Sequence, residues 1–416
     1  MAKCDTEVVI IGGGAAGIAA ARHLAKAAIE CLIVEARPRL GGRAFTVTDA
    51  SGFALDLGCG WLHSADRNPW VKVAQGQRRT LDTSLPPWAK PSLPLGFPLG
   101  EQEQFSDALQ GFFEGVGKIA AGPRDVPASE ALVPSGRWNN LISAVCTYIS
   151  GAEPDRLSSR DFDAYEDSGV NWRLREGYGA TIAAYGEGLP AVLNCPVLQI
   201  DHRGKRLKIE TAKGVITADR AIVTLPTNVL AEKEFLFSPA LPDKAASARG
   251  LPLGLDDKLF MSLENAEEFE DGSQVLGRTD RVSTAAYYFR PFGQPMIEAY
   301  FGGRCASALE EGGERAFFDF AAAELTGLFG NDFARRIKPQ ASHSWGADPF
   351  ARGSYSYAMP GRADCRAKLA APVDDRLFFA GEACSPDNFS TAHGGYLTGV
   401  AAAEQAITAR MRKKSL

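Results

Sequence analysis

Three glycines near the start of the chain have the spacing of a dinucleotide-binding turn. Gly12, Gly14 and Gly17 form GxGxxG between the β-branched run EVVII and the Ala-rich run AAARHLAKAA. The first glycine permits a tight turn, the second lets the backbone approach a diphosphate, and the third lets helix and strand pack closely. Glu35 ends the next apolar run, where an acid would accept hydrogen bonds from ribose hydroxyls. We therefore predict a dinucleotide with its diphosphate at a helix N-terminus; a Gly-rich turn in an unrelated α/β protein is the alternative.

Two further stretches carry the same kind of signal. In ARPRLGGRAFT, a Gly-Gly-Arg turn offers backbone donors and the guanidinium of Arg43 to the same diphosphate. Near the other end, LFFAGEACSPDNFSTAHGGYLTG is typical of a strand, a polar loop and the start of a helix. Gly381 allows close backbone approach, Glu382 can bind cofactor hydroxyls, and a helix after Gly394 would point its N-terminus at the cofactor ring. A C-terminal helix that only packs on the sheet is the alternative.

These motifs together resemble the flavin-containing amine oxidases. DLGCGWLHSADRNP and STAHGGYLTG are most similar to the branch of polyamine oxidases and lysine-specific histone demethylases. The similarity covers the first 70 residues or so, the middle strands and about the last 70. It implies non-covalent FAD, because Ser354 stands where family members that link FAD covalently carry a cysteine. The FAD contacts that it implies are Gly12, Gly14, Ala15, Ala16, Gly17, Glu35, Ala36, Arg37, Gly42, Arg43, Gly58, Gly60, Trp61, Val197, Pro226, Trp345, Gly381, Glu382, Thr391 and Tyr396.

The resemblance also implies catalytic roles. Lys258 corresponds to a lysine that holds a water against flavin N5 and assists the reaction with O2, and Trp345 to a tryptophan that packs near the flavin. Tyr355 and Tyr396 would face each other as a slot for the amine, and His63 could bind a substrate nitrogen. We place His393 at the cavity wall in a similar way. Acids that could hold a distal ammonium lie in SSRDFDAYEDSG, although such a run is often a solvated face: Asp161, Asp163, Glu166 and Asp167.

The implied reaction is oxidation of a C–N bond of a (poly)amine to an imine, with O2 as acceptor and H2O2 and an aldehyde as products. The partners are then a small-molecule amine and O2. An L-amino-acid oxidase of the same fold is one alternative, and it would need a cavity arginine to clamp the carboxylate. A flavin-dependent desaturase or isomerase, in which Lys258 has no role with oxygen, is a second. A non-enzymatic flavoprotein that binds a peptide tail is a third.

The elements that must position these residues alternate along the chain. We predict an α/β, two-domain fold: a Rossmann-like FAD domain built from residues 1–75, 178–245 and 345–416, and an α+β substrate domain built from 76–177 and 246–344. The region 76–177 is rich in Pro and short helical pieces, whereas alternation around Gly204 predicts a hairpin. KLFMSLE and MIEAYFGG are expected to be strands and RAFFDFAAAELTGLFG an amphipathic helix.

Composition narrows the class of protein. The 416 residues carry a net charge of -5, which disfavours nucleic acid as a partner. The eight cysteines form no CxxC pair or metal-ligand spacing, so we expect reduced thiols and no metal. The N-terminus has no signal-peptide pattern, and no stretch is apolar enough to span a bilayer. We expect a cytoplasmic monomer or homodimer.

Overall fold

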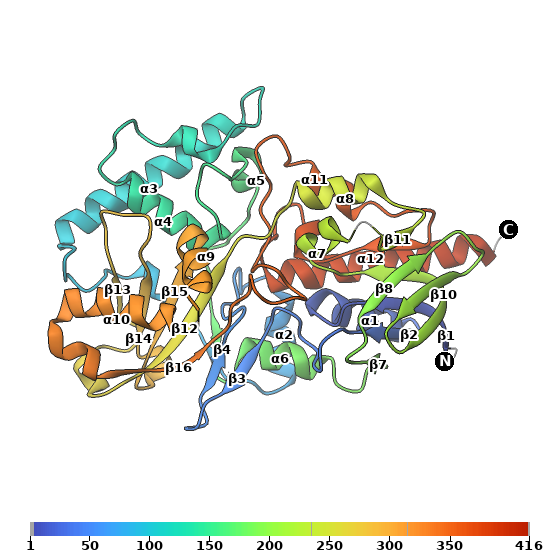
Figure 1. Ribbon diagram of the computed structural model, residues 1–416, viewed down its shortest axis with the longest axis horizontal. Helices are drawn as coiled ribbons and strands as arrows, with labels where there is room; N and C mark the ends of the chain where they lie inside the picture. Colours follow the sequence, from blue (N-terminus) through green and yellow to red (C-terminus); the bar gives the residue numbers. More distant parts are fainter. Residues whose placement is uncertain (1–3, 234, 314, 415–416) are drawn as a thin grey trace.

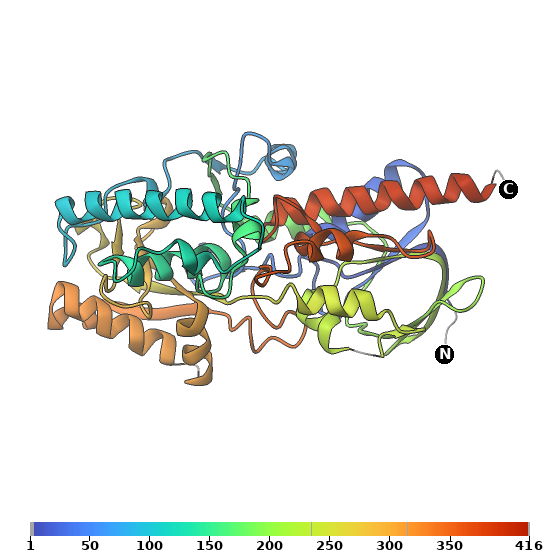
Figure 2. The same cartoon turned by 90° about the horizontal axis from the view of Figure 1, so that it is seen from above.

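The computed structural model describes residues 4–233, 235–313 and 315–414, which form two lobes side by side. One lobe carries both ends of the described chain and holds the larger β-sheet (Figure 1). The other lobe holds a smaller sheet with helices on either side of it (Figure 2).

The larger sheet has eight strands in the order β11-β8-β9-β10-β1-β2-β7, with β17 also paired to β10. β1 lies parallel to β10 and β2, and β17 lies parallel to β10, so their carboxyl ends meet at one edge. β9 is antiparallel to both β8 and β10, which confirms the hairpin predicted around Gly204. The strand bounds are β1 Cys4–Ile11, β2 Cys31–Val34, β7 Ala191–Val192, β8 Val197–Asp201, β9 Leu207–Thr211, β10 Gly214–Val223, β11 Phe237–Ser238 and β17 Leu377–Phe379.

Helices cover both faces of this sheet. On one face, α1 (Ala15–Lys26) and α12 (Ala392–Lys414) lie side by side although they come from opposite ends of the chain (Figure 1). Close packing of this pair requires Gly399, because a Cβ there would meet the carbonyl oxygen of Ala16 at 2.1 Å. The helices that cover the other face are α7 Thr227–Glu232, α8 Pro242–Arg249 and α11 Cys365–Ala370.

The smaller sheet is antiparallel, with the order β13-β14-β15-β12-β16. Its strands are β12 Asp256–Leu263, β13 Gln274–Leu276, β14 Ala286–Phe289, β15 Met296–Gly302 and β16 Ile337–Ser342. Ile297, Ala299 and Phe301 of β15 pack into a core with α10 (Ala316–Phe329). Because strand side chains alternate, Glu298 and Tyr300 lie on the opposite face.

The helices on that opposite side are α3 Leu99–Ala120, α4 Asn139–Ser150 and α5 Ser159–Asp163. The sequence predicted helical pieces here such as FSDALQGFFEGVGKIAAG, and most of that stretch lies in α3, a single helix of 22 residues. Apolar side chains on one side of it, including Phe112 and Val116, share one core with side chains of α4. The remaining elements are β3 Thr46–Thr48, β4 Ala54–Asp56, α2 Pro69–Gly76, β5 Leu81–Asp82, β6 Arg173–Leu174 and α6 Tyr178–Tyr185, with α9 Gly303–Glu311 beside β15.

Strand membership follows the alternation along the chain. The larger sheet takes its strands from residues 4–34, 191–238 and 377–379, and the smaller sheet from 256–342. The domain boundaries drawn from the sequence stay a prediction, because the sheets do not fix where a domain ends. In the part of the chain that the structure describes, no helix is long and apolar enough to cross a membrane. The cysteines described there are free thiols, mostly buried.

Candidate active site

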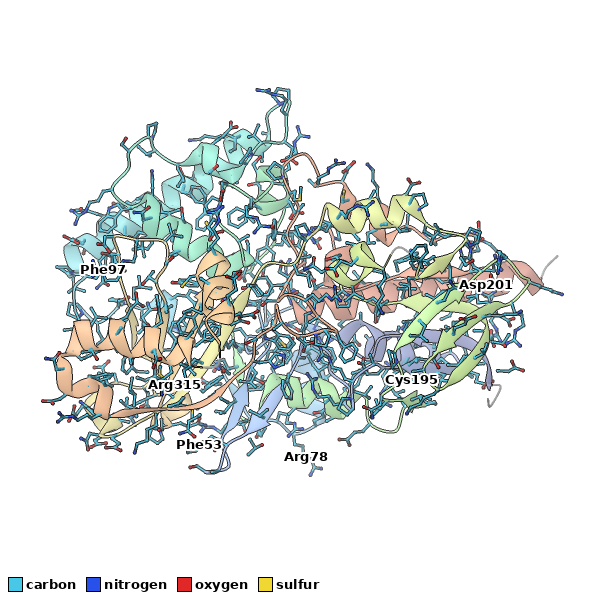
Figure 3. All side chains as sticks on the ribbon, viewed as in Figure 1. Phe53, Arg78, Phe97, Cys195, Asp201 and Arg315 are labelled. Atoms are coloured by element: carbon cyan, nitrogen blue, oxygen red, sulfur yellow. The ribbon has the colours of Figure 1, made fainter. Side chains whose placement is uncertain are left out.

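The carboxyl ends of four parallel strands open into one cavity of about 1430 Å³. Gly12, Glu35 and Thr224 directly follow β1, β2 and β10, and Gly381 comes two residues after β17; all four line the cavity. Ligands of α/β sheets bind at this edge because the loops diverge there and helix N-termini point at it. The cavity also reaches into the other lobe, because its lining includes both Cys195 at the larger sheet and Phe97 before α3, which Figure 3 labels in the two lobes.

Gly12, Gly14 and Gly17 of the turn between β1 and α1 are each required for a different structural reason. Gly12 has a φ of +108°, and a Cβ there would meet the Thr224 hydroxyl oxygen at 2.4 Å. A Cβ on Gly17 would meet the carbonyl oxygen of Gly12 at 2.0 Å, so strand and helix touch here. At Gly14 the nearest protein atom to an added Cβ is 3.8 Å away, and this residue lines the cavity. The turn therefore leaves its free space where a diphosphate would approach the N-terminus of α1.

The acid at the end of β2 is held in place by backbone donors. The Glu35 carboxylate accepts hydrogen bonds from Gly13 N at 2.7 Å and from Arg37 N at 2.8 Å. Arg37 itself forms a bidentate pair with Asp348, with N–O distances of 2.6 and 2.8 Å. The Arg37 guanidinium thus joins the loop after β16 to the segment after β2.

Arg43 and Glu382 pair with each other across the cavity wall. Arg43 Nη1 donates to Glu382 Oε1 at 2.9 Å and to the carbonyl of Ser354 at 2.8 Å. Glu382 Oε2 accepts from the Ser356 hydroxyl at 2.7 Å and from Ser390 N at 2.9 Å. Burial opposes ionisation of Glu382, but Arg43 outweighs it and lowers the pKa of the carboxyl. Both oxygens of Glu382 accept hydrogen bonds from protein donors, and the residue lines the cavity, so its predicted contact with the cofactor stays a prediction.

Beyond the glycines the cavity widens into a chamber with aromatic walls. Trp345 is buried, and its indole N–H donates to the carbonyl of Leu57 at 2.9 Å. Tyr355 donates its hydroxyl proton to the carbonyl of Tyr148 at 2.6 Å. His63 Nδ1 lies 2.7 Å from Asn171 Oδ1. Other aromatic side chains on the chamber wall are Trp61, Trp88, Phe97, Phe105, Phe113, Phe162, Tyr165, Tyr288, Tyr300 and Phe389.

Lys258 reaches the chamber from β12 and is buried. Its Nζ donates to the carbonyl of Asp56 at 3.1 Å and lies 3.4 Å from Glu298 Oε1. Glu298 is fully buried, and its other oxygen is 2.7 Å from Arg173 Nη1. The Tyr300 hydroxyl donates to Glu298 Oε1 at 2.7 Å. Burial would raise the pKa of Glu298, but Arg173 and Lys258 outweigh it and lower the pKa, so one buried anion serves two buried cations.

Two predicted site residues lie elsewhere. Tyr396 is not among the described residues that line the cavity; its ring packs against Trp70 and Tyr185, with centroids 5.2 and 6.5 Å apart. The predicted slot of Tyr355 and Tyr396 is therefore wrong, because Tyr396 faces the α2 and α6 side of its helix. His393 is also absent from the described cavity lining, and its Nε2 is 2.8 Å from Asn388 Oδ1.

The four acids of SSRDFDAYEDSG lie in different environments in the structure. Asp161 is buried and forms a bidentate pair with Arg366, so it is neither a solvated acid nor a substrate ligand. Glu166 is exposed and pairs with Arg67. Asp163 and Asp167 line the cavity. Burial opposes ionisation of Asp167, but hydrogen bonds from His63 and from the Gly169 N–H lower its pKa to about 2.

Most of the remaining predicted positions line the cavity. They are Gly12, Gly14, Ala15, Ala16, Glu35, Ala36, Arg37, Gly42, Arg43, Gly58, Gly60, Trp61, Val197, Pro226, Gly381, Glu382 and Thr391, with Lys258, His63, Trp345 and Tyr355 in the chamber. The sequence interpretation missed Glu298, Arg173 and Asp256. A lone acid inside the apolar strand MIEAYFGG was a signal for the first, because buried carboxylates need partners. In the described part of the chain, no group of three or more His, Cys, Asp or Glu side chains could hold a metal ion.

Comparison with known families decides the class of protein. The model of a flavin containing amine oxidoreductase matches residues 132–407. The chain belongs to this family. A model of an NAD(P)-binding Rossmann-like domain matches residues 10–74, which contain the glycine turn. The resemblance drawn from the motifs is confirmed.

Relatives and solved structures agree with this family. The chain is 29% identical to polyamine oxidase 4 of Oryza sativa subsp. japonica, over 96% of this chain and 88% of the rice protein. It is 24% identical to the lysine-specific histone demethylase 1 homolog 3 of Arabidopsis thaliana, over 97% of this chain but only 30% of that protein. A structure of putrescine oxidase bound to putrescine superposes with a TM-score of 0.80 at 17% identity, covering 98% of this chain and 100% of that one, which shows the shared fold.

The cofactor of this flavoenzyme is FAD, and the residues present fit it. Gly14 leaves space for a diphosphate at the start of α1, Glu35 presents a carboxylate at the end of β2, and Gly42 lines the same part of the cavity. The chamber with Trp345, Gly60 and Lys258 is continuous with that space and would hold the ring end. The two-domain α/β fold predicted from the sequence is confirmed.

Proposed function

We propose that the protein is an FAD-dependent oxidase of polyamines that converts a C–N bond to an imine. Bound FAD would supply the acceptor for the hydride equivalent from the carbon beside the nitrogen, with O2 as the final electron acceptor and H2O2 as its product. Hydrolysis of the free imine gives an aldehyde and a shorter amine or ammonia. The relatives named polyamine oxidases and the structure named as bound to putrescine support amines as the substrate class.

The observation that carries this proposal is the combination of acids and aromatic rings on the chamber wall. Acids and aromatic rings lie together on its wall, an arrangement that attracts ammonium groups and stabilises them by cation-π contact. The acids are Glu103, Asp163, Asp167 and Asp256. Asp167 stays ionised over the physiological range because its pKa is about 2.

The arginines argue against an L-amino-acid oxidase. A carboxylate clamp needs a guanidinium whose donors are free. Each arginine that lines the cavity within the described residues already has an acidic partner: Arg37 has Asp348, Arg43 has Glu382 and Arg352 has Glu232. We therefore expect amines without an α-carboxylate to be preferred.

Lys258 supports an oxidase over a desaturase. Its ammonium is fixed at the chamber wall by Asp56 and Glu298, where a positive charge stabilises superoxide as it forms. We expect Lys258→Met to slow re-oxidation of the reduced enzyme by O2 far more than its reduction by amine. An unchanged rate of re-oxidation would favour the desaturase or isomerase.

Ser354 supports non-covalent FAD. It lines the cavity, and its hydroxyl donates to the carbonyl of Asp256 at 3.0 Å and accepts from Asp256 N at 2.9 Å, so it offers no thiol for a linkage. Acid precipitation should release the yellow flavin into the supernatant. A cytoplasmic location and a monomeric or homodimeric state stay predictions.

The activity is tested by mixing the holoenzyme with spermine, spermidine, putrescine, a monoamine or L-amino acids under air. We expect O2 uptake matched by peroxide release with polyamines, and an aldehyde among the products. Peroxide release only with L-amino acids would overturn the proposal, and so would its absence with every amine.

A further inference from the structure

Asp256 is a buried acid on the chamber wall to which the sequence assigned no role. It is only 9% exposed, yet it lines the cavity. Side chains alternate along a strand, so Asp256 and Lys258 of β12 share the face toward the chamber, whereas Asp257 turns away and accepts from Trp345 N at 3.1 Å. Asp256 Oδ1 is buried without a hydrogen-bond partner in the described part of the chain. A buried carboxylate oxygen without a partner is rare and calls for a ligand that donates to it.

The surroundings of Asp256 are suited to an organic cation. Lys258 is already paired with Glu298, and Tyr355 directs its hydroxyl proton to the carbonyl of Tyr148. Tyr355 lies close enough to lower the pKa of Asp256, but its hydroxyl proton is directed to Tyr148, so Asp256 Oδ1 keeps room for a donor. Phenol rings next to an acid stabilise an alkylammonium by cation-π contact and charge. Asp256 interacts electrostatically with titratable groups from several elements. They are Lys258 and Asp257 of β12, Glu298 of β15, Tyr148 of α4, Tyr288 of β14 and Tyr355 of the loop before α11.

We propose that Asp256 Oδ1 receives the ammonium nitrogen of the substrate and takes a proton from it, which makes Asp256 a catalytic residue. The inference rests on the amine oxidation proposed above. An N–H bond breaks and an O–H bond forms, while the electron pair of the N–H bond remains on nitrogen as its lone pair. No oxidant is needed in this step. The amine nitrogen must carry a lone pair before hydride can leave the neighbouring carbon, so the step prepares the substrate for oxidation.

The protonation state of Asp256 suits this task. Burial raises its pKa to about 8, although Lys258 and Tyr355 act in the opposite direction. Below pH 8 the free protein therefore holds Asp256 as the neutral acid, and binding of an ammonium ion must expel one proton. Above pH 8 the carboxylate is already formed, and the ammonium binds without proton release. A base with a pKa near the working pH is efficient in proton transfer.

Binding of tert-butylammonium to the holoenzyme tests the ionic contact without turnover, because its carbon beside nitrogen bears no hydrogen. Calorimetry in buffers of different ionisation enthalpy counts the protons released. For the wild type we expect close to one proton released at pH 6.5 and close to none at pH 9.5. For Asp256→Asn, with FAD content and melting temperature checked, we expect weaker binding and the same count at both pH values. A wild-type count that does not change with pH, or equal behaviour of the variant, would overturn the inference.

Anaerobic reduction of the flavin by a polyamine tests the proton transfer itself. Asp256→Asn should slow reduction at pH 7.5 by about 10²-fold or more, because general bases contribute about 10²–10⁴-fold. Its pH profile should follow only the ionisation of the amine, and Asp256→Glu should restore part of the wild-type profile. If no amine reduces the wild-type flavin, the proposed function fails, while the calorimetry still decides whether Asp256 binds ammonium. If wild type and Asp256→Asn share one pH profile, the inference fails and the amine oxidase stands.

Discussion

Replacing Glu298 with glutamine should destabilise the protein strongly. The change keeps the volume of the side chain and an oxygen that can accept from Tyr300, but it removes the negative charge. Arg173 and Lys258 then remain as two cations, whose side chains are 9% and 5% exposed, without their shared anion. Removing one partner of a buried ion pair costs about 3–5 kcal/mol. We expect a loss of that size, with part of the Arg173 charge still stabilised by the ring of Trp61 at 4.9 Å.

Urea unfolding followed by circular dichroism measures this loss through the shift in midpoint at constant slope. Asp319→Asn is the matched control, because Asp319 forms a salt bridge with Arg315 in which both side chains are exposed; we expect a change of about 0.5 kcal/mol or less. The double variant Arg173→Met/Glu298→Gln should lose less than the sum of its single changes. A loss below about 1 kcal/mol for Glu298→Gln would refute the view that one anion holds two buried cations.

The Glu298 carboxylate should also make the stability of the protein depend on pH. The pKa of Glu298 is lowered in the folded protein, so its charge stabilises the fold above its usual pKa of 4.5, and this contribution is lost as the pH falls through the folded value. The stability difference between wild type and Glu298→Gln should therefore be full at pH 7 and shrink as the pH is lowered below 4.5. A difference that grows on acidification would contradict the assignment of the charge.

Other parts of the structure make separate predictions. Tyr355→Leu should lower kcat/KM for polyamines about tenfold, because it removes an aromatic side chain from the chamber wall. Tyr396 lies outside the cavity lining, so Tyr396→Phe should change kcat/KM less than twofold. Equal effects of the two variants would support the predicted pair of facing tyrosines. Gly14→Ala should fold but bind less FAD. Gly17→Ala should fail to fold, because the added Cβ would meet the carbonyl oxygen of Gly12 at 2.0 Å. Flavin content measures the first effect and circular dichroism the second. Burial lowers the pKa of His393 from 6.5 to about 4, so on acidification the unfolded chain takes up this proton before the folded protein does. The stability of the wild type should therefore fall between pH 6.5 and 4, by up to roughly 3 kcal/mol, and His393→Gln should weaken this pH dependence.

The parts that the sequence predicted well are those set by local pattern. The glycine turn, the strand before it and the acid after it follow from spacing within one βαβ unit, and the structure places all of them at one sheet edge. The strand patterns around Gly204 and in MIEAYFGG likewise depend on alternation over a few residues. The return of the last segment to the first sheet followed from its own glycine and acid at the end of a strand.

The parts that failed depend on contacts between distant segments. Whether Tyr396 faces the cavity or Trp70 is decided by which side of α12 meets α2, and the residue's own neighbours in sequence do not contain that information. Glu298 is recognisable as an acid in an apolar strand, but its partner Arg173 lies in a short strand of another segment. Arg37 lines the cavity as predicted, but its pair with Asp348, 311 residues further along the chain, could not be foreseen from its neighbours in sequence.

The central claim is that amines deliver electrons to FAD in this cavity. The most direct measurement is the anaerobic visible spectrum of the purified holoenzyme as spermine, spermidine, putrescine, a monoamine and several L-amino acids are added in turn. We predict bleaching of the oxidised flavin by polyamines, with little or none by L-amino acids. A spectrum that stays oxidised with every amine would contradict the account.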